Sequence, residues 1–361
     1  MAEAMIVGGG IGGLAAAVAL TRAGWRVTVL EQAGELREAG AGLTLMANAM
    51  RALDSLGLGD AVRAAGAAEG PGGIRTSGGR WLSRVDADEL IRVLGTAALG
   101  IHRAELQQIL AGALPAGVIR TGTRVDDPRE LEADAIVGAD GINSAVRRTY
   151  WPDSPGPAYS GSTTWRGIAA SEAPVPASIS WGRGTEFGTV PIGGGRVYWY
   201  AAITAAPNGS SALPPVFRRW HAPIPGLIAA TPPEAIVHND IWYLPHPPPS
   251  YVHGRVALLG DAAHAMTPNL GQGACQAIED AVVLAARLSE TADVPAGLAA
   301  YDRDRRPRTV GIARAAQQIG RYGQQLRNPV AVALRNTAMR LTPARVSLRS
   351  MARYADWHPP A

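Results

Sequence analysis

The amino-acid sequence predicts an α/β fold in which a parallel sheet carries an inserted β-sheet domain and a helical C-terminal tail. The chain opens with a strand, a glycine-rich turn, a helix and a second strand, which together form a βαβ unit. Apolar strand-like segments return near residues 135 and 255. Between residues 150 and 250, proline is frequent and tryptophans recur on alternating segments, a pattern typical of a sheet with one packed face.

The elements follow in chain order. We expect a strand at residues 5–7, then a turn and a helix that continues to Arg22 and ends at Gly24, and a strand at 27–30. The remaining elements expected are helices over 45–65, 102–114 and 273–288, strands over 135–139 and 255–259, and a mostly helical tail over 297–356. On the strand around Trp199, we expect Tyr198 and Tyr200 to share one face and Trp199 to occupy the other.

The length of 361 residues exceeds what one hydrophobic core usually serves, so we expect two domains. The inserted segment begins where composition changes and ends near the proline run at 245–249. We assign residues 1–70, 98–155 and 250–300 to the first domain, residues 71–97 and 156–249 to the inserted domain, and residues 301–361 to a C-terminal helical segment.

Composition excludes several classes of function. The net charge is +4, and all 34 basic side chains are arginine, so mechanisms that need a lysine are absent. The arginines are dispersed without interleaved aromatics, which argues against nucleic-acid binding. Cys275 is the single cysteine, which fits a reducing cytoplasm. The histidines lack metal-binding spacing, and no segment has the apolar length of a membrane span.

The turn after the first strand has the spacing of a dinucleotide-binding motif, G-x-G-x-x-G, at Gly8, Gly10 and Gly13. The first glycine permits a tight turn, the second lets a pyrophosphate approach the backbone, and the third lets the helix pack closely. The next strand ends at Glu31, where a carboxylate can bind a ribose hydroxyl. The motif therefore predicts a Rossmann-type domain that binds FAD or NAD, and Glu31 disfavours NADP.

Two later segments distinguish between these cofactors. One reads Gly260-Asp261 after a buried strand, followed by the glycine-rich segment 271–274 and a long helix; the other is Asp140-Gly141-Ile142-Asn143-Ser144 with Arg147. They resemble the G-D and D-G motifs of FAD-dependent monooxygenases of the p-hydroxybenzoate hydroxylase type, known as group A, in a compact form without a C-terminal thioredoxin-like domain. The resemblance covers nearly the whole chain and implies a Rossmann-type FAD-binding domain with an inserted substrate domain.

The resemblance also implies site residues. Glycines of the turn hold the pyrophosphate, Glu31 the ribose, Asp261 the ribityl or phosphate region, and the segment after Pro268 the isoalloxazine. The cofactor-binding residues implied are Gly8, Gly10, Ile11, Gly12, Gly13, Glu31, Gln32, Arg37, Thr44, Arg103, Val125, Asp140, Asp261, Pro268, Gly271, Gln272, Gly273, Ala274 and Cys275. Arg147 could instead brace the fold by pairing with Asp140. We expect His264 to be a packed loop histidine and Cys275 a small buried filler rather than an attachment point.

The implied reaction is that NADH or NADPH, a transient co-substrate, reduces the flavin. Oxygen then adds at flavin C4a, and the resulting hydroperoxide hydroxylates or epoxidises an aromatic or electron-rich small molecule. Tyr198 and Pro268 are the candidate catalytic residues. The candidate substrate residues are Arg166, Trp181, Phe187, Tyr198 and Tyr200, with Trp199 beside them. Tyr198 resembles a pocket tyrosine of the family's urate hydroxylases, whereas their arginine falls near Glu186 here, which argues against urate.

Two other functions stay open from sequence. A reductase or dehydrogenase could use the same scaffold, and it would place no oxygen from O2 in its product. A resistance or binding protein could sequester its ligand without turnover. Hydroxylation or epoxidation, NADH or NADPH, a catabolic or biosynthetic role, and a monomer or a homodimer are also left open.

Overall fold

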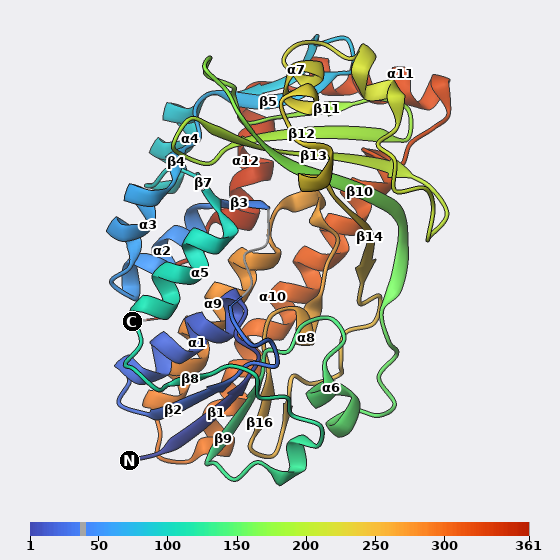
Figure 1. The fold of residues 1–361 in the computed structure, drawn as a ribbon. Coiled ribbons are helices and arrows are strands. Elements are labelled where there is room, and N and C mark those ends of the chain that lie inside the picture. The colour runs from blue at the N-terminus through green and yellow to red at the C-terminus, as the bar shows by residue number, and fades with distance from the viewer. Residues whose placement is uncertain (37–40, 361) are drawn as a thin grey trace.

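The computed structural model describes residues 1–36 and 41–360, which form two bodies (Figure 1). A six-stranded sheet occupies the lower body of that view and a seven-stranded sheet the upper body, while two long helices run between them. The mixed α/β class and the C-terminal helices predicted from sequence are confirmed.

The six-stranded sheet has the order β15-β16-β9-β1-β2-β8 and is parallel except at β15. Its strands are apolar and mostly buried, as expected of a parallel sheet covered by helices. Helices α1 (Ile11–Arg22) and α9 (Gly273–Ser289) pack side by side on it. The strands are β1 (Glu3–Val7), β2 (Arg26–Leu30), β8 (Ile119–Arg120), β9 (Ala135–Gly138), β15 (Val252–His253) and β16 (Val256–Leu258).

A three-stranded sheet and several short helices flank this domain. The helix expected over 45–65 is divided into α2 (Ala47–Ser55) and α3 (Gly59–Ala65), because Gly57 between them has φ of +68° and ends the helical run. The other elements are β3 (Gly42–Leu45), β4 (Ala67–Ala68), β7 (Leu99–His102), α5 (Arg103–Gly112), η1 (Pro128–Glu130) and α6 (Ala145–Tyr150).

The seven-stranded sheet has the order β14-β10-β13-β12-β11-β5-β6. Strands β5 and β6 come from residues 71–97 and join strands of the later insertion, so we propose the same domain division as the sequence suggests. The strands are β5 (Gly72–Thr76), β6 (Trp81–Val85), β10 (Ala158–Ala170), β11 (Ser178–Trp181), β12 (Thr185–Pro191), β13 (Arg196–Thr204) and β14 (Val237–Tyr243). The short helices around the sheet are α4 (Ala87–Leu94), η2 (Pro215–Arg219), α7 (Ile224–Ala229) and η3 (Pro233–Ala235).

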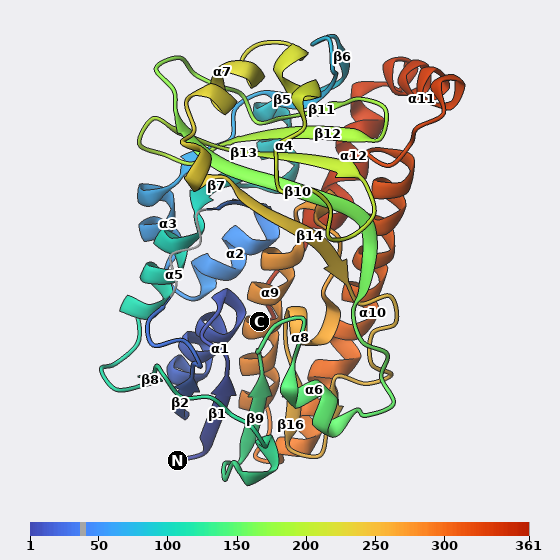
Figure 2. The ribbon, with the colours of Figure 1, turned by 45° about the vertical axis from the view of Figure 1, so that its right-hand side comes forward.

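The C-terminal third links the two bodies (Figure 2). After α8 (Asp261–His264) and η4 (Pro268–Leu270), helix α9 is followed by α10 (Val294–Tyr322), which packs on α9 and reaches the upper sheet. Helix α11 (Pro329–Leu341) lies beyond it, and α12 (Ala344–Ala355) returns to contact α2, α4 and β6. Within the described residues, no helix combines the length and apolarity needed to cross a bilayer.

Candidate active site

The carboxyl ends of four parallel strands bring the sequence motifs to one edge of the six-stranded sheet. Gly8 follows β1, Glu31 follows β2, Asp140 follows β9 after one residue, and Asp261 begins α8 just beyond β16. Because neighbouring strands run in the same direction, these segments, far apart in sequence, converge at that edge. This is the edge where open α/β sheets bind ligands.

The glycine-rich turn is shaped as an open cradle. Gly8 has φ of +109°, and a Cβ there would lie 2.4 Å from the Ala139 carbonyl oxygen. A Cβ on Gly13 would lie 2.0 Å from the Gly8 carbonyl oxygen, so these glycines are required by the packing. A Cβ on Gly10 would meet no atom within 4 Å. The space over Gly10 therefore belongs to no other described residue, which suits a bound pyrophosphate.

The same turn offers unpaired backbone donors. Gly10 is the N-cap of α1 and supplies no side-chain cap, and the first helical hydrogen bond comes from Leu14 N at 2.9 Å. The N–H groups of Ile11, Gly12 and Gly13 precede it and point to the open end of the helix. An uncapped helix N-terminus attracts a phosphate through these donors and the helix dipole.

Glu31 is hydrogen-bonded to the glycine-rich turn. Its Oε2 accepts a hydrogen bond of 2.7 Å from Gly9 N, and its Oε1 accepts one of 2.8 Å from Ala33 N. The carboxylate is thus fixed beside the glycine turn. Gln32, next in the chain, is exposed.

Asp140 combines a capping role with a free acceptor. Its Oδ2 accepts hydrogen bonds from Ala145 N at 2.6 Å and Val146 N at 3.1 Å, which caps α6. Its Oδ1 is buried and has no hydrogen-bond partner among the described residues. Arg147 does brace the fold, but through the carbonyl oxygens of Ala262 and Ile142 rather than through Asp140. A buried acceptor without a partner is costly, and a bound ligand would satisfy it.

Asp261 lies just beyond the end of β16 with an exposed side chain. Gly260 before it has φ of +61° and ψ of −137°, a backbone conformation that favours glycine. The Asp261 side chain is exposed and makes no side-chain hydrogen bond within residues 1–36 and 41–360. It can therefore accept hydrogen bonds from hydroxyl groups of a ligand.

The N-terminus of α9 is a second uncapped helix end. Gln272 is the N-cap but gives no side-chain cap, and a Cβ on Gly273 would meet nothing within 4 Å. The Gln272 side chain points elsewhere: its amide bonds Asn48, Gln276 and Met46 in the interior. Only its backbone is available to a ligand, together with those of exposed Gly271 and half-buried Ala274.

Cys275 is a buried filler. Its Sγ donates to the carbonyl oxygens of Gly271 and Thr44, both at 3.6 Å. Burial raises the pKa of the thiol to about 12, so it stays protonated at neutral pH. A protonated, enclosed thiol has little reactivity.

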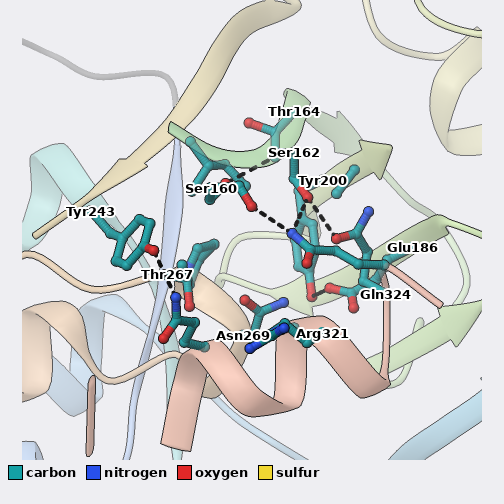
Figure 3. A pocket seen from close by; sticks show the side chains of 16 residues that line it. Ser160, Ser162, Thr164, Glu186, Tyr200, Tyr243, Thr267, Asn269, Arg321 and Gln324 are labelled. Atoms are coloured by element: carbon teal, nitrogen blue, oxygen red, sulfur yellow. Dashed lines mark hydrogen bonds between the residues drawn. The ribbon is translucent and has the colours of Figure 1, made fainter. Parts of the chain in front are cut away.

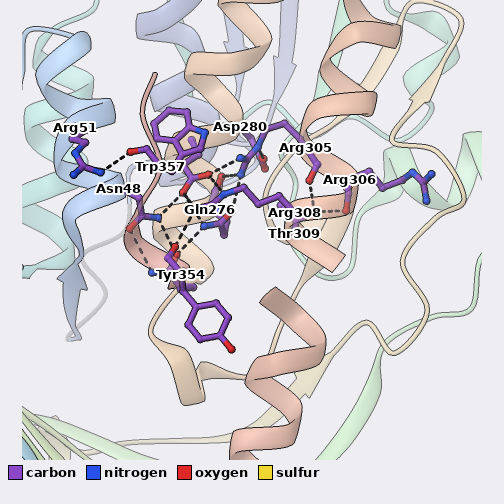
Figure 4. A network of polar contacts seen from close by, with 12 residues as sticks. Asn48, Arg51, Gln276, Asp280, Arg305, Arg306, Arg308, Thr309, Tyr354 and Trp357 are labelled. Carbon is purple, nitrogen blue, oxygen red and sulfur yellow. Dashed lines mark hydrogen bonds and ion pairs between the residues drawn. The ribbon is translucent and has the colours of Figure 1, made fainter. Parts of the chain in front are cut away.

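A buried ionic network between α9 and α10 packs against this edge (Figure 4). Asp280 accepts from Gly260 N at 3.0 Å, contacts His264 Nε2 at 2.6 Å and pairs with Arg305 Nε at 2.7 Å. Burial disfavours its ionisation, but His264 and Arg305 outweigh burial and lower the pKa of Asp280 to about 2. Asp280 therefore fixes Gly260 and the start of α8, which carries Asp261, and His264 is packed as expected but at the end of α8 rather than in a loop.

For the remaining cofactor candidates, the structure gives fewer contacts with the cofactor edge. Arg103 is exposed at the start of α5, Thr44 Oγ1 donates to Glu69 Oε1 at 2.8 Å, and Val125 packs against the core of the six-stranded sheet. Arg37 lies outside the described residues.

A polar cavity lies beneath the seven-stranded sheet (Figure 3). One wall comes from β10, β12, β13 and β14, and the other from η4 and the last turns of α10. Pro268, which begins η4, lines the cavity and stands three residues before the glycine-rich entry to α9. The cavity therefore adjoins the cofactor edge. The lining residues are Ser160, Ser162, Thr164, Glu186, Tyr200, Ala202, Ile241, Tyr243, Thr267, Pro268, Asn269, Gln317, Gly320, Arg321, Gln324 and Gln325.

Glu186 is the buried acid of this cavity. Its Oε1 accepts a hydrogen bond of 2.9 Å from the Tyr200 hydroxyl, and its Oε2 accepts one of 2.7 Å from Trp181 Nε1. Burial raises the pKa of Glu186 against the opposing effect of those bonds and of Arg335. Burial, Glu186 and Tyr198 raise the pKa of Tyr200 well above its ordinary value. Both groups are therefore favoured in their neutral forms.

Tyr198 and Arg166 lie next to the cavity wall rather than in it. Tyr198 is 9% exposed and packs with Ala41 and Ile192, and its ring centroid is 6.3 Å from that of Tyr200. Burial raises the pKa of Tyr198, and Arg166 and Arg103 oppose this shift. The buried Nε of Arg166 has no hydrogen-bond partner among the described residues.

Phe187, a candidate substrate residue, does not line this cavity. Phe187 stacks on Trp199 with ring centroids 5.4 Å apart, inside a core that Phe217 and Trp220 complete. Residues alternate along β12, so Phe187 and its neighbour Glu186 point to opposite faces of the sheet. Trp199 lies on the same far face, opposite Tyr198 and Tyr200, as alternation on β13 predicts. Trp181 reaches the cavity only through Glu186.

Sequence reasoning missed the wall supplied by α10. Gln317, Gly320, Arg321 and Gln324 line the cavity at helical spacing of three and four residues. A polar stripe at that spacing is visible in the sequence, but it indicates only a helix face and not what the face meets.

A flavin dinucleotide fits the cofactor edge on three observations. The space over Gly10 is open, Asp140 Oδ1 is buried without a partner, and the N-termini of α1 and α9 are both uncapped. Together they supply donors for the anionic parts of the molecule and acceptors for its hydroxyl groups.

Known proteins share this arrangement. Residues 1–316 match the model of the FAD binding domain family. An aurachin C monooxygenase/isomerase of Stigmatella aurantiaca is 41% identical over 360 residues, which is 93% of each chain. A 2-heptyl-3-hydroxy-4(1H)-quinolone synthase of Pseudomonas aeruginosa is 35% identical and covers 94% of each chain. Klebsiella pneumoniae HpxO, solved with FAD and uric acid, has a TM-score of 0.90 at 27% identity over 98% of this chain and 96% of that one.

Proposed function

The chain belongs to the group A FAD-dependent monooxygenases and is an enzyme that oxidises aromatic compounds, and from this premise we propose that its substrate is a neutral, fused nitrogen heterocycle of the quinolone type. We propose NADH or NADPH as the reductant and O2 as the oxidant. The observation that carries the substrate class is Glu186, a buried acid whose pKa burial raises, in a cavity next to the cofactor edge.

The residues that would hold FAD divide into donors and acceptors. The backbone of Gly10 to Gly13 would bind the pyrophosphate, and Glu31 the ribose. Asp261 and Oδ1 of Asp140 are acceptors without partners among the described residues. The N-terminus of α9 would place its donors and its dipole where negative charge collects on the ring. When bound, FAD supplies a centre that accepts a hydride and delivers one oxygen atom of O2.

The protein's part in the chemistry is to orient the substrate and to exclude water. Pro268 and Thr267 from η4 and its N-cap face the sheet residues Thr164 and Tyr200 across the cavity, so a flat ring between them would lie beside the cofactor edge. Water at such a site diverts the oxygen to a side reaction, so enclosure raises the yield of product. Helix α10 forms the wall that encloses this space.

The chemistry of the cavity favours a neutral polar substrate. Tyr200 and the hydroxyl and amide side chains of the wall can donate and accept hydrogen bonds without net charge, and burial shifts Glu186 towards its neutral form. Arg321 is the single cation among the described lining residues, and it is exposed. An aromatic carboxylate would lack a buried cation to pair with, and burying an unpaired charge is costly. A ring that carries both N–H and C=O groups would pair with the hydrogen-bond acceptors and donors of the cavity wall.

One relative supports this class by its name, because it is named for making 2-heptyl-3-hydroxy-4(1H)-quinolone. The other is named as an aurachin C monooxygenase/isomerase. Both match this chain over both domains. We therefore propose hydroxylation of the heterocyclic ring rather than epoxidation.

The experiment is a substrate panel on purified, FAD-loaded protein. The panel contains 4-quinolones with and without an alkyl chain, 3-hydroxybenzoate and urate, and the readouts are NADH and NADPH oxidation and product mass under oxygen-18. We expect a quinolone to stimulate oxidation at least about tenfold over the other compounds and to gain one heavy oxygen atom.

Two results would contradict the proposal. Stimulation by 3-hydroxybenzoate but by no quinolone would overturn the substrate class and leave the monooxygenase intact. Oxidation of NADH or NADPH without heavy oxygen in any product would indicate the reductase alternative.

A further inference from the structure

Helix α11 presents aliphatic side chains to solvent. The helix projects at the edge of the upper body (Figures 1 and 2). Val330, Leu334 and Leu341 are 66%, 67% and 77% exposed, and their spacing of four and seven residues places them on one face. Val346, just after the helix, is 53% exposed. An amphipathic helix on a globular body normally turns such side chains inward.

The opposite face of α11 holds a cation. Arg335 Nη1 donates to the Gly323 carbonyl oxygen at 2.6 Å, and its guanidinium lies 4.8 Å from the centre of the Trp181 ring. Arg335 is half-buried, as are Val332 and Met339 on the same side. The helix is therefore attached to the body by the face that includes Arg335, and its large aliphatic face is left free.

The charge of this region differs from that of the rest of the chain. From Arg305 to Ala355 there are 11 arginines and no aspartate or glutamate. The first 304 residues contain 23 arginines and 29 acidic residues, a net charge of −6. Close in sequence to the aliphatic face, Arg327, Arg340, Arg345 and Arg349 are exposed, and none forms an ion pair with another described residue.

We propose that α11 and the start of α12 dock on an anionic lipid surface. Val330, Leu334, Leu341 and Val346 would enter the boundary between headgroups and acyl chains, and the surrounding arginines would contact the lipid phosphates. Interfacial helices bind in this way, by apolar burial together with attraction to anionic lipids. The acidic remainder of the molecule would be held away from the same surface by its negative charge.

A second copy of the chain fits this face less well. A symmetric contact would place the same patch against itself, so the arginines around each patch would meet like charges. An anionic surface instead neutralises every one of them. The charge of the patch thus selects lipid over self-association.

The docking face lies close to the substrate cavity. Arg321 and Gln324 line the cavity from the end of α10, only a few residues before α11 begins. Trp181, which Arg335 contacts, donates to Glu186 on the cavity wall. A docked molecule would hold this end of the cavity near the lipid, where a neutral substrate that carries an alkyl chain is concentrated. The docking itself does not depend on which compound is hydroxylated.

The test is flotation of FAD-loaded protein with vesicles of phosphatidylcholine alone or mixed equally with phosphatidylglycerol. The wild type should float with the anionic vesicles and little with the neutral ones, and added salt should release it. Combined Val330→Ser, Leu334→Ser and Leu341→Ser should lower partitioning at least about tenfold. The matched control is Val93→Ser with Val216→Ser, which changes exposed valines elsewhere and should float like the wild type.

The charge arm uses Arg340→Gln, Arg345→Gln and Arg349→Gln, each expected to lower partitioning about fivefold. Its control changes three exposed arginines elsewhere, Arg80→Gln, Arg92→Gln and Arg183→Gln. FAD content and circular dichroism establish that each variant is folded. Equal flotation of wild type and aliphatic variant, or no flotation of either, overturns the proposal. A dimer in light scattering that the aliphatic variant converts to monomer would assign the face to self-association instead.

Discussion

The cofactor edge and the substrate cavity are built in different ways. The cofactor edge uses backbone: glycines without side chains, uncapped helix ends and a few carboxylates, most of them just after a parallel strand. The cavity uses side chains from six elements that are distant in sequence. A cofactor site can therefore be encoded in short contiguous motifs, whereas a specificity site depends on which faces of separate elements meet.

The largest effect is expected from a side chain placed in the glycine-rich turn of the cofactor edge. Gly10→Val should reduce bound FAD by more than about tenfold, because the side chain would occupy the space of the pyrophosphate. The apoprotein should still fold, since a Cβ at Gly10 meets nothing within 4 Å. FAD absorbance and circular dichroism measure the two effects. Gly112→Val, another glycine with free space at the end of α5, is the control and should keep its FAD.

Disrupting the buried ionic network around Asp280 tests whether the cofactor edge depends on this network for its stability. Asp280→Asn should lower the free energy of unfolding by about 3 kcal/mol, because His264 and Arg305 lose a buried ionised partner. Asp304→Asn breaks an exposed pair with Arg287 and should cost less than about 1 kcal/mol. Urea unfolding compares the two variants. Equal losses would show that the buried network does not hold the edge.

The same substitution has a signature in pH. The pKa of Asp280 is lowered from 3.8 to about 2 in the folded protein, so the folded state binds fewer protons than the unfolded state between these values. Its contribution to stability is present above pH 3.8 and is lost as pH falls towards 2. Asp280→Asn should remove this part of the acid sensitivity, as acid titrations of unfolding would reveal.

In the cavity, the side chain rather than the backbone should matter. Glu186→Leu leaves the Tyr200 hydroxyl and Trp181 Nε1 without their acceptor, and it should raise KM for substrate about tenfold. Glu186→Gln keeps an acceptor and should stay within about threefold of the wild type. Neither change should alter FAD content. If the two variants behaved alike, hydrogen bonding by Glu186 would not explain substrate binding.

Glu186 also predicts a pH dependence of the opposite sign. Its pKa is raised above the ordinary value of 4.5, so the folded state binds more protons than the unfolded state as pH rises through and above that value. Its contribution to stability is complete at lower pH and falls as pH increases. Glu186→Gln should flatten this decline, which thermal unfolding across pH would measure.

The smallest expected effects separate the two tyrosines. Tyr200→Phe removes a hydrogen bond at the cavity wall and should lower kcat/KM about fivefold. Tyr198 lies behind the wall near Arg166, so Tyr198→Phe should lower the coupling of NAD(P)H oxidation to product only about twofold, with FAD content unchanged. A larger effect at Tyr198 than at Tyr200 would place Tyr198 in the substrate site and revise the cavity.

Short motifs were enough to predict the cofactor edge. Gly8 and Gly260 have positive φ, and a Cβ on Gly13 would meet Gly8, so these glycines have reasons that operate within a few residues. Glu31 and Asp261 follow strands whose direction the βαβ pattern dictates. Alternation along β13 likewise separates Trp199 from the two tyrosines beside it, because successive side chains of a strand point to opposite faces of its sheet.

The residues that line the cavity depend on how distant elements pack together. Alternation placed Phe187 and Glu186 on opposite faces of β12, but it did not say which face would meet the cofactor domain and which would be covered by η2 and α7. The wall from Gln317 to Gln324 depends on the length and direction of α10. Local periodicity specifies which residues share a face, whereas the packing of distant elements specifies what that face touches.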